Sequence, residues 1–315
     1  MQLSFRYLCL PLTAAILFLG SCKKDDNDDN DQDVDTPDPA TEVAVHSSDQ
    51  NRVSSDIDMA VNDATTAMES SASFSGARMM NLNSICNALA TADTSAGQRK
   101  ITIAYNGNNC AGTHHRSGTV TVSMPTNTRW KNAGAVITLT YQDLKVRRLS
   151  DNTSITINGA LTLTNVSGGL LINLSQASNI IHELASSSMT ISFDNNTQRV
   201  WQVARKKVYS YNNGIVLTVT GNHTIGSNTQ VAEWGTNRFG RAFTTSITQP
   251  VVIRQDCSFR VTAGEIKHEG FATATATFGL DASANPTGCP GAGTYFMKIT
   301  WIPPIGNPQS VILPY

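Results

Sequence analysis

The sequence predicts a mainly β protein, with a large antiparallel sheet or sandwich preceded by one N-terminal helix. From residue 99 onward, Thr, Val and Ile alternate with polar residues in short runs, and this period of two is typical of strands with one buried face. Turns rich in Asn and Gly separate the runs. No long helical pattern lies between them, so parallel βαβ units are not expected.

The first residues have the features of an export signal. Arg6 precedes an almost wholly apolar run that ends at Leu19. This run is shorter than the roughly 20 residues of a membrane-spanning helix and is typical of a cleaved signal peptide. The segment Leu19-Gly20-Ser21-Cys22 follows directly and resembles the bacterial lipobox. The resemblance implies that residues 1–21 are a lipoprotein signal peptide. It also implies that Cys22 carries diacylglycerol on its thiol and a further acyl chain, such as palmitate, on its new amino terminus.

Residues 22–50 are predicted to be a disordered acidic tether. They begin with a dense set of aspartates and have few apolar side chains, so burial cannot offset the entropy of ordering them. The aspartates lack the Gly and final Glu of an EF-hand loop. Residues 1–42 hold three of the 23 basic and nine of the 24 acidic side chains, so the remainder has a net charge of about +5. That density is below the level of a dedicated nucleic-acid binder, and no nucleic-acid partner is expected.

Residues 51–75 are predicted to form the leading helix. One apolar face follows spacings of three and four along Val53, Ile57, Val61, Ala64 and Met68. Ser54 or Ser55 could cap its start, with acidic residues in the first turn. The helix is expected to pack on the sheet or to serve as a stalk.

Residues 76–315 are predicted to be the β-rich domain. Within Ser154–Asn165, the side chains of Ile155, Ile157, Leu161 and Leu163 are expected to face one side, with a weak point or bulge at Gly159-Ala160. Ser175–Ser188 is expected to be a short helix. The predicted strands are Ile101–Tyr105, Thr119–Met124, Ala135–Leu144, Ser154–Asn165, Leu170–Leu174, Met189–Asp194, Val200–Val203, Ile215–His223, Arg241–Thr248, Val251–Ile253, Phe259–Thr262, Thr273–Phe278 and Tyr295–Trp301.

The chain has six cysteines. Cys9 leaves with the signal peptide and Cys22 is lipidated, so four remain in an exported chain, where disulfides persist. Three pairings are possible. We favour Cys86–Cys110 and Cys257–Cys289 because each pair brackets a plausible strand unit. No CxxC occurs, and neither spacing indicates a metal site.

The motifs together resemble a family of uncharacterised Bacteroidetes lipoproteins. The resemblance rests on the segment from Ile101 to Gly112, on Arg116–Val120, on Gly134–Leu139, on Leu161–Asn165 and on the late cysteine unit. It implies an all-β domain, lipid-anchored at the outer membrane, and no established activity. Acidic residues that the family has in its first turn and after its second cysteine are absent here. In addition, Lys23-Lys24-Asp25-Asp26 resembles the signal that sends some of these lipoproteins to the cell surface.

Several clusters contain side chains of the types that carry catalysis or bind ligands. Adjacent His114 and His115 would point to opposite faces of a strand and rarely share a metal. In a loop they could share one, but we interpret them as part of an exposed loop without a metal. His182-Glu183 lacks the second histidine of a zinc protease motif. No GxSxG occurs, and the acids of the β region are scattered. Basic residues at Lys145–Arg148 and Arg205–Lys207 are interpreted as solvated strand edges. The alternative is that they bind anionic polysaccharide or lipid head groups. The four tryptophans are interpreted as core or cross-strand partners.

These observations predict a cell-envelope lipoprotein with a non-catalytic binding or structural module. Membrane attachment through Cys22 is expected, with a glycan or an envelope protein as a further partner. No catalytic residue, metal or cofactor is nominated. The alternative is a surface hydrolase or a component of glycan utilisation.

Overall fold

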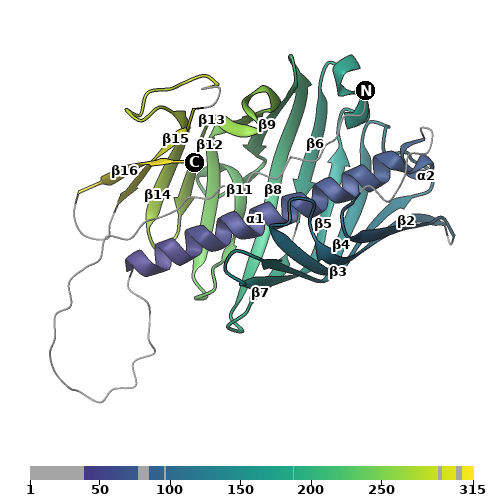
Figure 1. The fold of residues 1–315 in the computed structure, drawn as a ribbon, viewed down its shortest axis with the longest axis horizontal. Coiled ribbons are helices and arrows are strands. Elements are labelled where there is room, and N and C mark those ends of the chain that lie inside the picture. Colours follow the sequence, from purple (N-terminus) through teal and green to yellow (C-terminus); the bar gives the residue numbers. More distant parts are fainter. Residues whose placement is uncertain (1–38, 77–84, 96, 187, 290–292, 303–306) are drawn as a thin grey trace.

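The computed structural model describes residues 39–76, 85–95, 97–186, 188–289, 293–302 and 307–315. It confirms the predicted fold class, because one large antiparallel sheet follows one long helix (Figure 1). The signal peptide, Cys22 and the tether up to residue 38 lie outside the described residues. None of the described helices is both long and apolar enough to cross a bilayer.

The helices are α1 (Pro39–Ser70) and the single turn α2 (Ala72–Ser75). The strands are β1 (Ala88–Asp93), β2 (Gln98–Asn108), β3 (His114–Pro125), β4 (Ala135–Arg148), β5 (Ser154–Asn165), β6 (Ile180–Ala185), β7 (Met189–Phe193), β8 (Gln198–Tyr211), β9 (Ile215–Gly221), β10 (His223–Ile225), β11 (Asn228–Thr236), β12 (Ala242–Arg254), β13 (Arg260–Glu269), β14 (Thr273–Leu280), β15 (Phe296–Ile302) and β16 (Gln309–Pro314).

Strand order in the sheet follows the chain almost throughout. The path runs β1-β2-β3-β4-β5-β6-β8-β11-β12-β13-β14-β15-β16, with β7, β9 and β10 paired beside it. β1 and β16 are therefore the two ends of this path. In Figure 1, α1 runs across the sheet from the C-terminal strands toward β2.

Strand alternation explains the register. In β5, Ile155, Ile157, Leu161 and Leu163 are all buried, as predicted. Gly159 has a φ of +127°, and a Cβ there would lie 3.1 Å from the Met189 Cα on β7. The irregularity expected near Gly159 lies on β4, where the pairing shifts between Tyr141 and Leu144.

The helix α1 begins at Pro39 rather than at residue 51, so its first turns replace part of the predicted tether. Ser54 and Ser55 therefore lie inside the helix and are not caps. Polar contacts with the turn between β11 and β12, and not an apolar stripe, fix these first turns of the helix. Glu42 accepts a hydrogen bond from Asn237 Nδ2 at 2.9 Å and pairs with Arg241 at 2.8 Å. Local hydrophobic periodicity could not indicate such long-range partners.

The apolar face predicted for the helix is confirmed. Val53, Ile57, Val61, Ala64 and Met68 are buried in one core cluster with residues of β1–β8. A second cluster, formed mainly by β9 and β11–β15, contains no α1 residue among those described. The helix therefore covers the N-terminal half of the sheet with its apolar face. The C-terminal half of the sheet faces another side of the helix.

Two predictions between residues 170 and 188 are wrong. Residues Leu171–Gln176 form a 3-10 turn instead of a strand. The segment predicted as a helix contains β6, whose inward side chains are Ile180, His182 and Leu184. The buried polar His182 interrupts the apolar alternation, and Ile181 beside Ile180 suggests a helical spacing.

Candidate functional site

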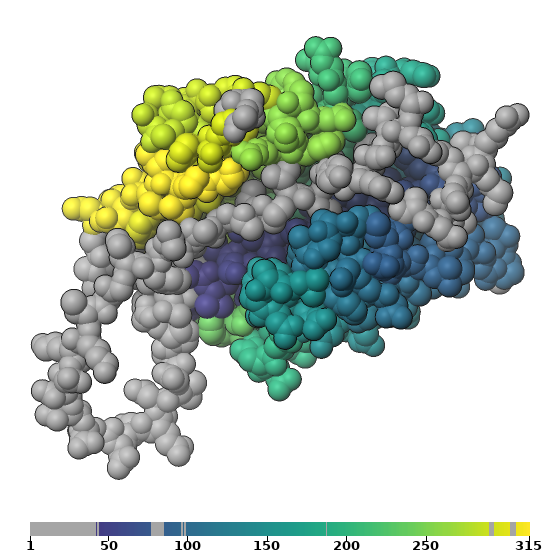
Figure 2. All heavy atoms as spheres, in the orientation of Figure 1, coloured from purple at the N-terminus to yellow at the C-terminus, as the bar shows by residue number. Residues whose placement is uncertain are grey.

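A groove lies between α1 and the C-terminal half of the sheet. It encloses about 310 Å³, which is within the range of small-molecule sites. In Figure 2, part of α1 (purple) is visible between the N-terminal strands (blue) and the C-terminal strands (yellow). A second hollow of similar volume lies on another side of α1, and its lining is mainly polar.

The wall of the groove contributed by the sheet is mainly aliphatic. It is formed by inward side chains of β9 and β11–β15, which include Leu217, Val219, Ile247, Val261, Phe278 and Met297. Most of these residues belong to the second core cluster. Phe278 is the one benzenoid ring among the described lining residues, so the wall lacks the aromatic platforms on which sugar rings stack.

The wall contributed by α1 is polar. Eight helix residues line the groove, and none of them is aliphatic: His46, Ser47, Gln50, Asn51, Ser54, Ser55, Asp58 and Asn62. Their spacing places them on one face, because residues four apart on a helix are neighbours. An apolar sheet therefore faces a polar helix across an open space, so the sheet wall has no apolar partner on α1.

A network of ion pairs joins the two walls. Asp58 pairs with Lys207 Nζ at 2.8 Å and with Arg205 Nη1 at 3.1 Å. Arg205 also contacts Glu233, which accepts hydrogen bonds from Ser54 Oγ at 2.8 Å and from Trp201 Nε1 at 2.9 Å. Burial alone would raise the pKa of Asp58, but Lys207 and Arg205 outweigh burial and hold it below its ordinary value. The network contains two acidic and two basic side chains.

Two histidines line the groove near the start of α1. The ring of His46 lies 4.4 Å from that of His268 and 4.8 Å from that of Phe243, centroid to centroid. Burial, His268 and the nearby Arg199 lower the pKa of His46 to about 2. Burial and Arg199 lower the pKa of His268 to about 4. Both rings are neutral at physiological pH.

His46 is 5% exposed, and neither of its ring nitrogens has a hydrogen-bond partner among the described residues. His268 differs, because its Nδ1 lies 3.3 Å from Thr245 Oγ1. A buried polar group without a partner is unfavourable by roughly 1–3 kcal/mol. An unpaired imidazole that lines a groove is therefore a feature that a bound ligand would satisfy.

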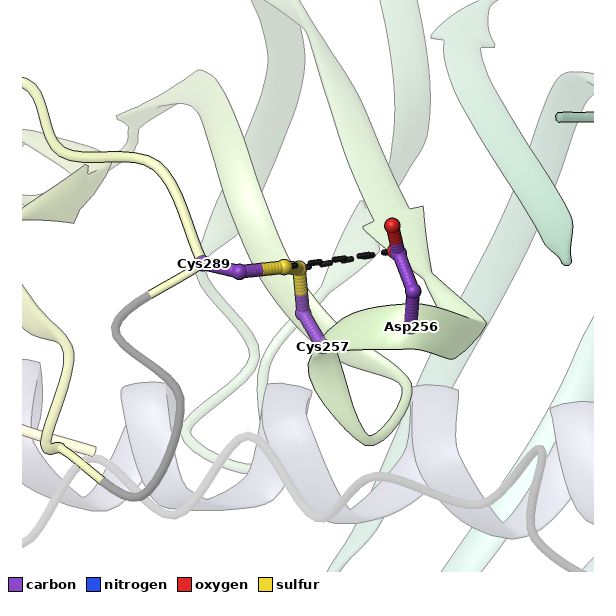
Figure 3. A group of neighbouring side chains, drawn as sticks. All are labelled: Asp256, Cys257 and Cys289. Carbon is purple, nitrogen blue, oxygen red and sulfur yellow. Dashed lines mark hydrogen bonds between the residues drawn. A yellow bond between two sulfur atoms is a disulfide. The ribbon is translucent and has the colours of Figure 1, made fainter. Parts of the chain in front are cut away.

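Both predicted disulfides are present. Cys86–Cys110 and Cys257–Cys289 have Cα–Cα distances of 5.1 and 5.3 Å, within the usual range. Among the described residues, the one group of three potential metal ligands consists of Asp256, Cys257 and Cys289. Asp256 Oδ1 lies 3.6 and 3.9 Å from the two sulfur atoms (Figure 3). The disulfide removes both thiolates, so this group does not present a metal site.

The expectation that the adjacent histidines lie in an exposed loop is wrong, because both are half-buried at the start of β3. His114 Nδ1 is 2.9 Å from Thr113 Oγ1, and its Nε2 is 3.9 Å from Asp56 Oδ1. The row of hydroxyl, imidazole and carboxylate is the nearest approach to a nucleophile site that we find among the described residues. The 3.9 Å gap is longer than a hydrogen bond. Burial also raises the pKa of Asp56 to about 7, although Arg52 opposes the shift.

The remaining candidate residues pack in the core or lie in solvent. His182 is buried between the rings of Trp130 and Tyr209, and burial lowers its pKa to about 3. Trp130 and Trp201 are fully buried, as predicted for core residues. On β4, the Lys145 side chain is exposed as expected for a solvated position.

The interpretation of Arg205 and Lys207 as solvated edge residues is wrong. Both are buried on β8, which lies inside the sheet. Alternation along β8 could have predicted that both are buried. Every second residue of a strand shares one face, and the apolar residues on this face, Val203 and Tyr209, are buried beside Arg205 and Lys207.

The groove residues on α1 could not be identified without the fold, because Ser, Asn and Gln on a helix usually indicate a solvated face. Residues 86–301, on which the resemblance to Bacteroidetes lipoproteins rests, contain the sheet wall of the groove. In comparisons with protein-family models, with curated proteins and with solved structures, nothing matches this chain.

Proposed function

We propose that this chain is a lipid-anchored cell-envelope protein whose folded part binds an apolar small molecule and catalyses no reaction. The observation that carries the binding role is the aliphatic sheet wall, which faces an open groove instead of an apolar helix face. Burying apolar surface is favourable by roughly 25 cal/mol per Å². A ligand that fills the groove would gain this energy without a rearrangement of the sheet.

The anchor is supported by the sequence from Leu19 to Cys22 and by the acidic segment that follows it. Acyl chains contribute about 0.8 kcal/mol per buried methylene, so two or more chains give stable attachment. We place the anchored protein at the outer membrane, with its folded part beyond the tether. An apolar ligand suits this place, because membranes are the reservoir of apolar molecules in a cell envelope.

An apolar ligand is better supported than a glycan. The sheet wall offers aliphatic side chains, whereas sugar recognition uses aromatic faces and dense polar contacts. That the chain also binds an envelope protein stays a prediction. A surface hydrolase is less well supported, because the Thr113–His114–Asp56 row lacks the second hydrogen bond of a nucleophile site.

The test is a fluorescence titration of the full chain carrying Cys22→Ser, which removes the acyl chains and the need for detergent. N-phenyl-1-naphthylamine, an uncharged apolar dye, is expected to bind saturably at one site. Ile299→Trp places a larger side chain in the groove and is expected to weaken dye binding at least tenfold. The matched control is Lys298→Trp, on the exposed face of the same strand β15.

Two results would reject the proposal. One is the absence of saturable dye binding to the folded chain. The other is equal weakening by Ile299→Trp and Lys298→Trp, because only the first side chain lines the groove. Circular dichroism and melting curves of each variant show whether the chain is folded.

A further inference from the structure

We infer that the groove selects an uncharged amphiphile, with an apolar body against the sheet and hydroxyl, ester or amide groups against α1. The inference rests on the proposed function and names the chemical class of its ligand. Three features of the groove support it: the charge balance of its walls, the polar groups along the helix, and the unpaired imidazole near the start of α1.

The charges that line the groove cancel. Asp58 and Glu233 oppose Arg205 and Lys207, and every member already has a partner within the network. The two lining histidines are neutral. A charged head group would have to leave water without gaining an unpaired opposite charge, and removing a charge from water is strongly unfavourable without compensation. Both anionic and cationic amphiphiles are therefore disfavoured.

The helix offers neutral hydrogen-bonding groups along its whole groove face. The side chains of Ser47, Asn51, Ser55 and Asn62 are half-buried. None of these side chains forms a hydrogen bond to another described residue, so their donor and acceptor groups are unoccupied. Hydroxyl and carboxamide groups both donate and accept, so they match ligand hydroxyl, ester or amide groups. From residue 46 to residue 62 the helix extends about 24 Å at 1.5 Å per residue, which indicates an elongated ligand.

His46 supplies an independent indication of a ligand. Its ring is nine-tenths buried, it lines the groove, and both nitrogens lack a partner among the described residues. A neutral imidazole has one donor and one acceptor nitrogen. A ligand hydroxyl could serve either nitrogen, whereas a quaternary ammonium could serve neither.

The test compares three single-chain amphiphiles with twelve-carbon chains: monolauroylglycerol, laurate and dodecyltrimethylammonium. Each displaces N-phenyl-1-naphthylamine from the Cys22→Ser chain at pH 7.5, below its micellar concentration. Monolauroylglycerol is expected to bind at least tenfold more tightly than either charged compound. If the dye binds and a charged compound competes as well as the glycerol ester, this inference is overturned and the proposed function stands. If the dye does not bind saturably, both are overturned.

Charge variants of the network provide a second measurement. Asp58→Asn leaves a surplus of positive charge, so the affinity of laurate relative to monolauroylglycerol is expected to rise at least fivefold. Lys207→Met leaves a surplus of negative charge and is expected to raise the relative affinity of dodecyltrimethylammonium. Each ratio is measured within one variant, so a change in the folded fraction cancels. Ratios that stay constant, or that move in the same direction in both variants, contradict the charge-balance argument.

His46→Phe keeps the ring contacts with His268 and Phe243 and removes both nitrogens. It is expected to weaken monolauroylglycerol at least threefold and to leave the affinity of the dye within twofold. Equal effects on the two compounds would show that His46 acts only through packing.

Discussion

Replacing Ile57 by alanine is expected to distinguish the two faces of α1. Ile57 is 1% exposed and lies in the core cluster beneath the helix. Truncation of a buried isoleucine to alanine destabilises proteins by about 2–5 kcal/mol. Alanine also improves helix propensity by a few tenths of a kcal/mol. The net loss in free energy of unfolding is therefore expected to be about 2–4 kcal/mol.

Ser55→Ala is the matched control, because Ser55 is nearby on α1 but lines the groove. Its half-buried hydroxyl has no described partner, and alanine again improves helix propensity. We expect a change smaller than about 0.5 kcal/mol in either direction. The two variants differ by one half-turn of the helix, so their comparison reports which face is packed on the sheet.

Urea denaturation of the Cys22→Ser chain, followed by tryptophan fluorescence, measures both changes. Trp130 and Trp201 are fully buried, so unfolding exposes them. With a slope of about 3 kcal/mol per M, Ile57→Ala is expected to lower the midpoint by about 1 M. A midpoint that falls only for Ser55→Ala would show that the helix presents its other face to the sheet. Equal falls for the two variants would refute the assignment of one packed face.

Three further predictions concern the anchor, a turn and a buried acid. Cys22→Ser is expected to abolish incorporation of labelled palmitate and to move the chain from the membrane to the soluble fraction; unchanged fractionation would contradict the lipid anchor. Gly118→Ala is expected to destabilise by at least about 2 kcal/mol, because φ is +100° and the new Cβ would collide with the Asp143 carbonyl. Gly134→Ala, with a φ of +76° and open space around it, is expected to cost about 1 kcal/mol, and equal melting temperatures for the two would refute the argument. Burial raises the pKa of Asp56 to about 7, although Arg52 opposes the shift. The folded state then binds the extra proton between about pH 4 and 7, so wild-type stability falls as pH rises through this window by up to about 1.4 kcal/mol per pH unit. Asp56→Asn is expected to flatten the decline, and urea midpoints from pH 4.5 to 8 measure it.

The sequence predicts the strands well where one face is buried throughout. Ser154–Asn165 agrees with β5 at both ends, because its isoleucines and leucines alternate with other residues on both sides of Gly159. Alternation fails where a buried position is polar. His182 in β6 and Arg205 and Lys207 in β8 have partners that are distant in the sequence. A local pattern contains no information on such partners.

The groove could not be predicted from the sequence for a related reason. Its helix wall has the composition of a solvated helix face, and its sheet wall has the composition of an ordinary core. The site exists because the fold places one opposite the other. The early start of α1 is likewise due to Glu42 and Asp49, which pair with residues near the turn that follows β11.

The placement of α1 has a consequence for how the protein is made. The helix is synthesised before every described strand, yet Asp58 pairs with a residue 149 positions later, and Glu42 bonds to one 195 positions later. Contacts of such large sequence separation slow folding, because long loops must close before they form. The helix α1 therefore leaves the ribosome before the strands that it contacts, and it reaches its final contacts only after most of the sheet has assembled around it. Until then, a helix with one apolar face remains exposed and is prone to aggregation.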